Sequence, residues 1–121
     1  MSEAPNSKPY DLEERTFDFA RRVAPFCQEL PRSATNLEYG RQLIRASGSV
    51  GANYIQGNES LGKKDFQMRI KICRKEAKES GYWIGLIIEV NREKFTTNGL
   101  QLLDEASQLK KIFSSILQKS K

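Results

Sequence analysis

The side chains best suited to chemistry are two carboxylates and two guanidinium groups near the middle of the chain. Glu76 and Glu79 stand three residues apart, and Arg41 and Arg45 stand four apart. At these spacings each pair lies on one face of a helix. Two carboxylates could bind a metal or transfer protons, but buried carboxylates also need cationic partners. We therefore predict a buried ion-pairing group made of Arg41, Arg45, Glu76 and Glu79.

Catalysis is not indicated, because the chain contains no histidine. This removes Ser-His-Asp and Cys-His catalysis, histidine-ligated zinc and the Glu-x-x-His motif of di-metal bundles. Cys27 and Cys73 form no C-x-x-C pair, so they are predicted to be buried reduced thiols. We expect a protein that is not an enzyme, with no catalytic residues, no metal site and no cofactor.

A stripe of basic residues is the clearest candidate for binding. At 100° per residue, Lys64, Lys71, Lys75 and Lys78 fall within about 60° of arc on one helix, and Arg69 and Arg74 flank them. Such a stripe is either a solvated helix face or a surface that neutralises phosphates. No aromatic residue interleaves with these lysines, so we expect recognition of backbone or shape rather than of bases.

Four amphipathic segments would position these groups. No segment alternates with period 2, so no strand is predicted. The helices are expected from Asp11 to Pro31, from Thr35 or Asn36 to about Gln56 with Gly57 as a stop, from Lys63 to about Asn91, and from Asn98 to the C-terminal lysines. Their short connections favour antiparallel neighbours. The predicted fold is all-α, an up-down-up-down antiparallel four-helix bundle.

The third helix has a second apolar seam beside the one expected to face the core. The core seam contains Phe66, Ile70, Cys73, Ala77, Ser80, Ile84 and Ile87, and the second contains Ile72, Glu76, Glu79, Trp83, Leu86 and Val90. In the second helix, the face opposite the core seam contains Ile44, Gly48, Gly51, Ala52 and Ile55, and its two glycines would allow another backbone to approach closely. We interpret Ile72, Glu76, Glu79, Trp83, Leu86, Gly48 and Gly51 as an oligomer interface. Tighter packing within the bundle is the alternative.

Length and composition indicate one helical domain. The 121 residues carry a net charge of +5, and residues 63–94 hold nine basic against five acidic side chains. We expect a disordered lead-in at 1–9, the bundle at 10–119 and a tail at 120–121. No apolar run is long enough to span a membrane, and the polar N-terminus does not resemble a signal peptide, so a cytoplasmic location is expected.

Several segments resemble one family. They are Tyr10-Asp11-Leu12-Glu13, the run from Gln42 to Gly57 containing Arg45-Ala46-Ser47-Gly48-Ser49-Val50-Gly51-Ala52-Asn53, then Lys64-Asp65-Phe66, Lys75-Glu76-Ala77-Lys78-Glu79-Ser80 and Tyr82-Trp83. They resemble the bacterial four-helix-bundle proteins encoded by intervening sequences of 23S ribosomal RNA genes. That family is related to the accessory protein of diversity-generating retroelements. The resemblance implies the same fold and a pentameric barrel, and the retroelement relative binds nucleic acid and a reverse transcriptase.

Two functions remain open at this stage. The first is a homo-oligomer, expected to be a pentamer, that binds structured RNA or DNA through the lysine stripe. The second is a protein-interaction adaptor that uses the apolar seams and binds no nucleic acid. No membrane partner is expected.

Overall fold

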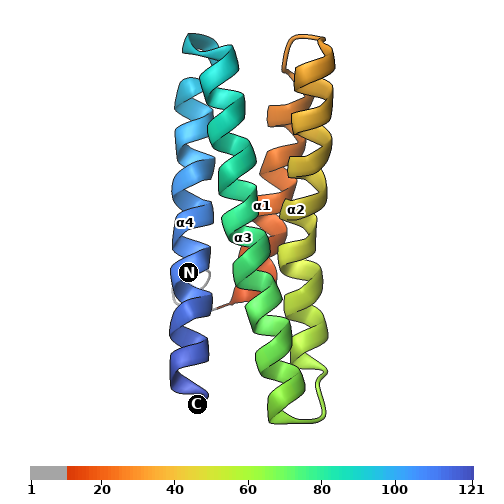
Figure 1. Ribbon diagram of the computed structural model, residues 1–121, viewed down its shortest axis with the longest axis vertical. Coiled ribbons are helices and arrows are strands. Elements are labelled where there is room, and N and C mark those ends of the chain that lie inside the picture. Colours follow the sequence, from red (N-terminus) through yellow and green to blue (C-terminus); the bar gives the residue numbers. More distant parts are fainter. Residues whose placement is uncertain (1–10) are drawn as a thin grey trace, which may run out of the picture.

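The computed structural model describes residues 11–121, apart from the side chain of Glu93. The expected lead-in at 1–9 lies outside the described residues. The chain forms α1 (Leu12–Gln28), α2 (Ala34–Asn58), α3 (Lys63–Asn91), the short 3-10 helix η2 (Glu93–Phe95) and α4 (Thr96–Lys119). Successive helices run antiparallel, and Figure 1 shows them as an up-down-up-down bundle. The predicted all-α fold is therefore confirmed.

The helix starts follow from capping chemistry. The Asp11 carboxylate accepts a hydrogen bond from the Glu14 amide at 3.2 Å, as the sequence indicated. Helix α2 begins earlier than expected, because the Ser33 hydroxyl accepts from the Asn36 amide at 3.0 Å and acts as the N-cap. Both caps satisfy a backbone donor that the first turn of a helix leaves free.

Three expected boundaries differ from the structure. Gly57 is not a helix stop but a buried residue inside α2, where a Cβ would lie 3.3 Å from the Cβ of Arg69. Helix α1 ends at Gln28, before Pro31. Helix α4 begins at Thr96, before Asn98, because η2 leads directly into it.

All four helices contribute to one hydrophobic core. The predicted core seam of α3 is largely buried. In α1, however, Phe26 is buried while the predicted Cys27 is only half-buried. The fully buried large side chains are Phe19, Val23, Leu43, Val50, Ile70, Ile84, Ile87, Leu109 and Phe113. Removing these apolar surfaces from water is the main stabilising contribution to such a bundle.

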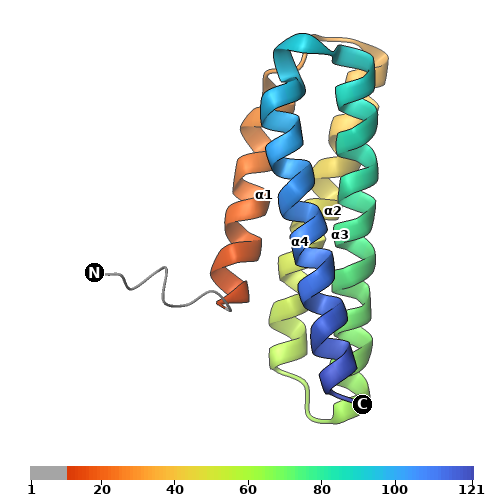
Figure 2. The same ribbon diagram turned by 90° about the vertical axis from the view of Figure 1, so that its left-hand side faces the viewer.

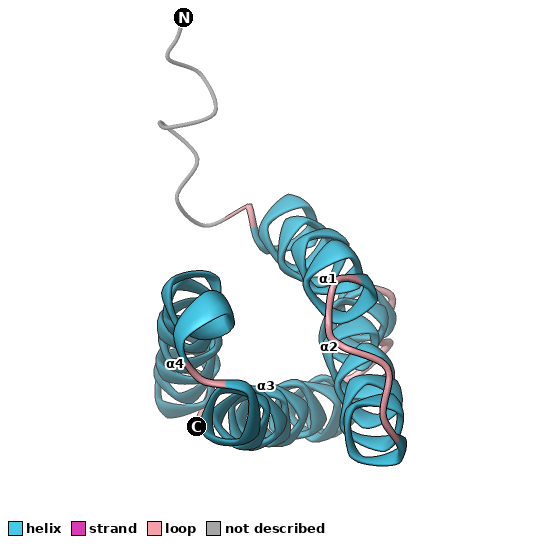
Figure 3. Cartoon of the chain, turned by 90° about the horizontal axis from the view of Figure 1, so that it is seen from above, coloured by secondary structure: helices cyan, strands magenta, loops and turns pink. Residues whose placement is uncertain are grey.

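Helix α1 is shorter than the other three and begins part-way along the bundle (Figure 2). The end of the bundle that holds the loop between α2 and α3 therefore consists of α2, α3 and α4 only. The lysine stripe begins at this end. Helix α1 packs mainly on α2 and only sparsely on α4. Viewed from above, α1 and α4 are the most widely spaced neighbours in the ring of helices (Figure 3). Arg15 links them, donating from Nε to Glu105 at 2.7 Å and from Nη2 to Gln108 at 2.9 Å.

Gly51 allows the close approach of α1 to α2. A Cβ at this position would lie 2.8 Å from the Thr16 hydroxyl oxygen. That hydroxyl cannot rotate away freely, because it donates to the Leu12 carbonyl at 2.6 Å. Packing between α1 and α2 within one chain therefore explains why a glycine stands at position 51. This is the alternative to an oligomer interface that the sequence left open.

Two glycine substitutions should change stability in opposite directions. Gly85→Ala should raise the free energy of unfolding by up to about 1 kcal/mol, because alanine favours the helix and a Cβ at Gly85 has open space around it. Gly51→Ala should lower it by about 1–2 kcal/mol, because the clash with Thr16 outweighs the same gain. Urea unfolding followed by circular dichroism measures both. Equal stabilisation by the two variants would contradict the close contact at Gly51.

Candidate nucleic-acid interface

The predicted lysine stripe lies on the outward face of α3. Lys64, Lys71, Lys75 and Lys78 are all exposed, opposite the buried seam that contains Ile70. At 1.5 Å per residue, the stripe from Lys64 to Lys78 is about 21 Å long. Along the axis of B-DNA, where each strand carries one charge per about 3.4 Å, this length corresponds to about six phosphates of one strand. The stripe therefore has the length of a short nucleic-acid contact.

The lysines of the stripe have no acidic partners among the described side chains. Within residues 11–121, every ion pair found involves an arginine: Arg15, Arg21, Arg22, Arg41, Arg45 or Arg92. Between positions 63 and 78 the sequence has seven basic and two acidic residues, and one of those two, Glu76, is buried. The outward face of α3 thus carries positive charge that the chain does not neutralise locally.

The two arginines that flank the stripe differ from the lysines. Both Arg69 and Arg74 are half-buried. Arg69 donates from Nη1 to the Asn53 side-chain oxygen at 2.9 Å, which holds it against α2. Arg69 is therefore partly committed to helix packing, whereas the four lysines are free to bind a ligand.

Helix α4 adds further positive charge at the same end of the bundle. The Gln67 side-chain amide donates to the Ser120 carbonyl at 2.8 Å, which places the end of α4 beside the start of α3. Residues 107–121 contain four lysines and no acidic residue. They are Lys110, Lys111, Lys119 and Lys121. The basic region thus extends from α3 across to α4.

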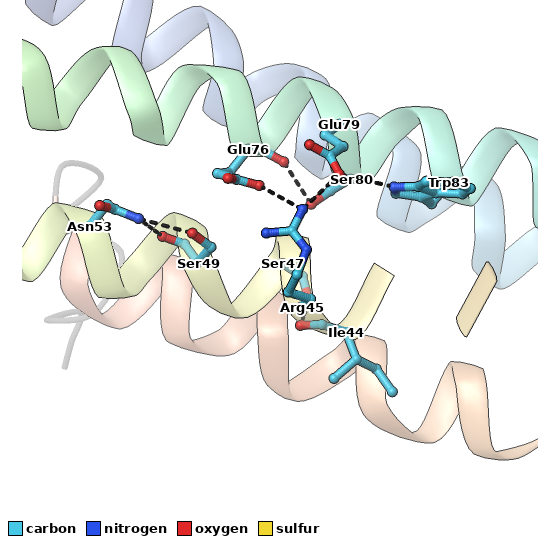
Figure 4. Close-up of polar contacts among 9 residues, drawn as sticks. All are labelled: Ile44, Arg45, Ser47, Ser49, Asn53, Glu76, Glu79, Ser80 and Trp83. Atoms are coloured by element: carbon cyan, nitrogen blue, oxygen red, sulfur yellow. Dashed lines mark hydrogen bonds and ion pairs between the residues drawn. The ribbon is translucent and has the colours of Figure 1, made fainter. Parts of the chain in front are cut away.

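The structure brings Arg45 together with both glutamates, as Figure 4 shows. Its Nη2 lies 3.3 Å from Glu76 Oε1 and 2.7 Å from Glu79 Oε2. Burial disfavours the guanidinium charge, but the two carboxylates outweigh this effect and raise the pKa of Arg45 above its ordinary value. Arg41 does not join the group and pairs with Glu38 instead. The two contacts of Arg45 with Glu76 and Glu79 tie α2 to α3.

This cluster does not have the composition of a metal centre. No group of three or more potential metal ligands occurs in the part of the chain that the structure describes. Glu79 also accepts a hydrogen bond from Trp83 Nε1 at 3.3 Å. The same oxygen, Glu79 Oε2, thus accepts from an arginine and from an indole, which is a structural arrangement.

The residues of the predicted oligomer interface do not form one exposed patch. Glu76 is buried and paired, and Gly51 lies against Thr16. Ile72, Trp83 and Leu86 are half-buried, and Trp83 packs on Tyr39 with ring centroids 5.7 Å apart. The flank of α2 thus covers part of the second seam. Gly48 is exposed, and a Cβ there would meet nothing within 4 Å.

An exposed apolar surface follows the outer side of α1 and α2. Ile44 and Ile55 on α2 are about half exposed, and Phe17 and Leu37 are more exposed still. Gly48 and Ala52 lie between the two isoleucines, and an open groove runs from here to the acidic start of α1 at Asp11, Glu13 and Glu14. The sequence suggested Ile44, Gly48, Ala52 and Ile55 but not Phe17 or Leu37. The spacing Leu37, Ile44, Gly48 and Ile55 was a usable signal for this face.

Comparison with known proteins identifies the family. The model of the 23S rRNA-intervening sequence protein family matches residues 9–115. The chain belongs to this family. The resemblance seen in the sequence is thus confirmed. Comparison with curated proteins gives no match.

One similar solved structure supports the fold. It is the crystal structure of a protein of unknown function from the S23 ribosomal protein family of Bacteroides thetaiotaomicron. The TM-score is 0.76 and the sequence identity 22%, over 87% of this chain and 96% of that chain. At this identity the similarity establishes the fold alone. None of the helices within residues 11–121 has both the length and the apolar character to cross a bilayer.

A structural role for the Arg45 cluster can be tested by unfolding. Arg45→Met leaves the Glu76 carboxylate buried without its cation, so it should lower the free energy of unfolding by about 2 kcal/mol. Adding Glu76→Gln removes the unpaired charge and should recover part of this loss. Urea unfolding of both variants at neutral pH provides the measurement. If Arg45→Met were as stable as the parent protein, the ion pair would contribute nothing to the bundle.

Proposed function

We propose that this member of the 23S rRNA-intervening sequence family is a cytoplasmic, non-enzymatic homo-oligomer that binds structured RNA or DNA through basic faces. The observation that carries the proposal is the row of exposed lysines on α3 that lack acidic partners among the described side chains. Lysines in such a row neutralise phosphates and release counterions. They recognise backbone or shape and not a particular sequence.

Oligomerisation would strengthen this binding by repeating the stripe. Each added subunit brings four more lysines to the same surface, and linked contacts act at high effective concentration. A single exposed lysine face is common on helices and adds little affinity by itself. Several copies together can contact many phosphates, which makes binding both tight and steeply dependent on salt.

We propose the outer side of α1 and α2 as the contact between copies. It holds the exposed apolar residues Phe17, Ile44 and Ile55, and its rim is acidic at Glu13 and Glu14. An acidic rim repels nucleic acid, whereas the same chain supplies the opposite charge in its C-terminal lysines. A contact between two different surfaces closes into a ring when the rotation allows it. A pentamer is the stoichiometry that the family resemblance implies.

The exposed apolar surface also suits a second function. A protein-interaction adaptor would use Ile44 and Ile55 to bind another protein, and its lysines would remain solvated. Absence of nucleic-acid binding in the experiment below, together with an intact oligomer, would favour the adaptor.

Charge reversal on α3 tests nucleic-acid binding directly. Lys71→Glu with Lys75→Glu should weaken binding to a structured RNA and a DNA duplex by roughly tenfold or more, and make the log–log salt slope shallower by about 2 for each subunit that contacts the ligand. Fluorescence anisotropy across a salt series gives both quantities.

A matched control separates a local effect from net charge. Arg32→Glu with Lys94→Glu makes the same change in charge at the opposite end of the bundle, where both residues are exposed. This control should retain most of the binding. Equal affinities of the α3 variant and the parent protein would show that the lysines are ordinary solvated surface.

The interface between copies is tested by Ile44→Glu. Because Ile44 is 50% exposed in the single chain, helical content should stay unchanged while the oligomer dissociates. Leu61→Glu is the control, since Leu61 is fully exposed in the loop between α2 and α3, away from this face. Sedimentation equilibrium gives the mass of each variant. An Ile44→Glu protein with the same mass as the parent would exclude this face as the interface.

A further inference from the structure

An aromatic residue continues the lysine stripe by one more helical turn. Tyr82 follows Lys78 by four residues and Lys75 by seven, and at 100° per residue it points in the same direction as Lys64. Its side chain is 63% exposed, although it is large and apolar over most of its area. No aromatic residue interleaves with the lysines of the stripe on this face, and Tyr82 adds one at the next turn.

The Tyr82 ring packs against Trp83 and is otherwise largely exposed to solvent. It packs edge-on against Trp83, with centroids 5.2 Å apart and an interplanar angle of 77°. Trp83 is itself fixed by Tyr39 and by its hydrogen bond to Glu79. One turn further on stands Gly85, where a Cβ would meet nothing within 4 Å. No side chain at that position can cover the ring, so it is both held in place and accessible.

We infer that Tyr82 is a stacking platform for an unpaired nucleotide base, while Lys78 and Lys75 hold phosphates of the same strand. The inference rests on the proposed function and narrows the ligand to RNA or DNA that contains unpaired nucleotides. Helical side chains lean toward the N-terminus, so the Tyr82 ring lies toward Lys78. Any base offers a π-face to an aromatic ring, but bases inside a duplex are already stacked. An unpaired base has its faces free and can therefore use this ring, whereas a base inside a duplex cannot.

The site also contains its own reporter, because Trp83 is the only tryptophan of the chain. A base that stacks on Tyr82 changes the surroundings of the adjacent indole. Titration with a single-stranded oligonucleotide should therefore alter Trp83 fluorescence, whereas a blunt duplex of the same length should alter it much less.

The decisive experiment compares three Tyr82 variants on two probes. The probes are a blunt RNA duplex and the same duplex with an unpaired overhang, measured by anisotropy at one salt concentration. Tyr82→Ala and Tyr82→Leu should weaken binding to the overhang probe about 5- to 100-fold and leave blunt-duplex binding nearly unchanged. Tyr82→Phe keeps the ring and should bind both probes as the parent protein does. Sedimentation of each variant confirms the parent's mass.

The outcomes separate this inference from the proposed function. If Lys71→Glu with Lys75→Glu abolishes binding but Tyr82→Ala binds the overhang probe as tightly as the parent, the lysines contact phosphates and Tyr82 stacks on nothing. If Tyr82→Leu matches Tyr82→Phe, apolar contact rather than stacking is involved, and the inference is wrong. If the parent protein binds neither probe even at low salt, the proposed function and this inference both fail.

Discussion

Helix α3 packs against α2 on one side and against α4 on the other, and its third side closes the hydrophobic core. Only one arc of its surface is left in contact with solvent, and this constraint decides which residues each face of α3 can carry. Residues that cannot be buried must occupy that arc, and Lys64, Lys71, Lys75 and Lys78 do so. The same packing that buries Ile70, Ile84 and Ile87 therefore aligns the lysines in a row.

The packing of α3 also explains why it has two apolar seams. The first seam faces the core, whereas the second lies against the flank of α2, where Trp83 meets Tyr39 and Glu76 meets Arg45. Charged groups are tolerated between α2 and α3 because Arg45 lies at the edge of the bundle, where half of its side chain remains in contact with water. A fully enclosed pair would carry a much larger cost of desolvation. The cluster thus fixes the position of α3 on α2 without making the interior polar.

Helix α1 is held less firmly than the other three, and this shapes the outer surface. It approaches α2 closely at Gly51 and reaches α4 mainly through Arg15 and Glu105. Because α1 is short, the basic end of the bundle is built from α2, α3 and α4 only (Figure 2). Its own outer side, together with α2, carries the exposed apolar residues Phe17, Leu37, Ile44 and Ile55. The molecule therefore separates an apolar side with an acidic rim from a basic side.

The amino-acid sequence was enough to predict the four helices, their antiparallel order and the lysine stripe, because these depend on periodicity and short connections that are local in the chain. It also placed Glu76 and Glu79 near Arg45. The partner of each group could be assigned only from the packed structure. Arg41 pairs with Glu38, Gly51 lies against Thr16, and Trp83 packs on Tyr39. Such choices depend on how far one helix is rotated and shifted against the next, and no spacing within a single helix contains that information.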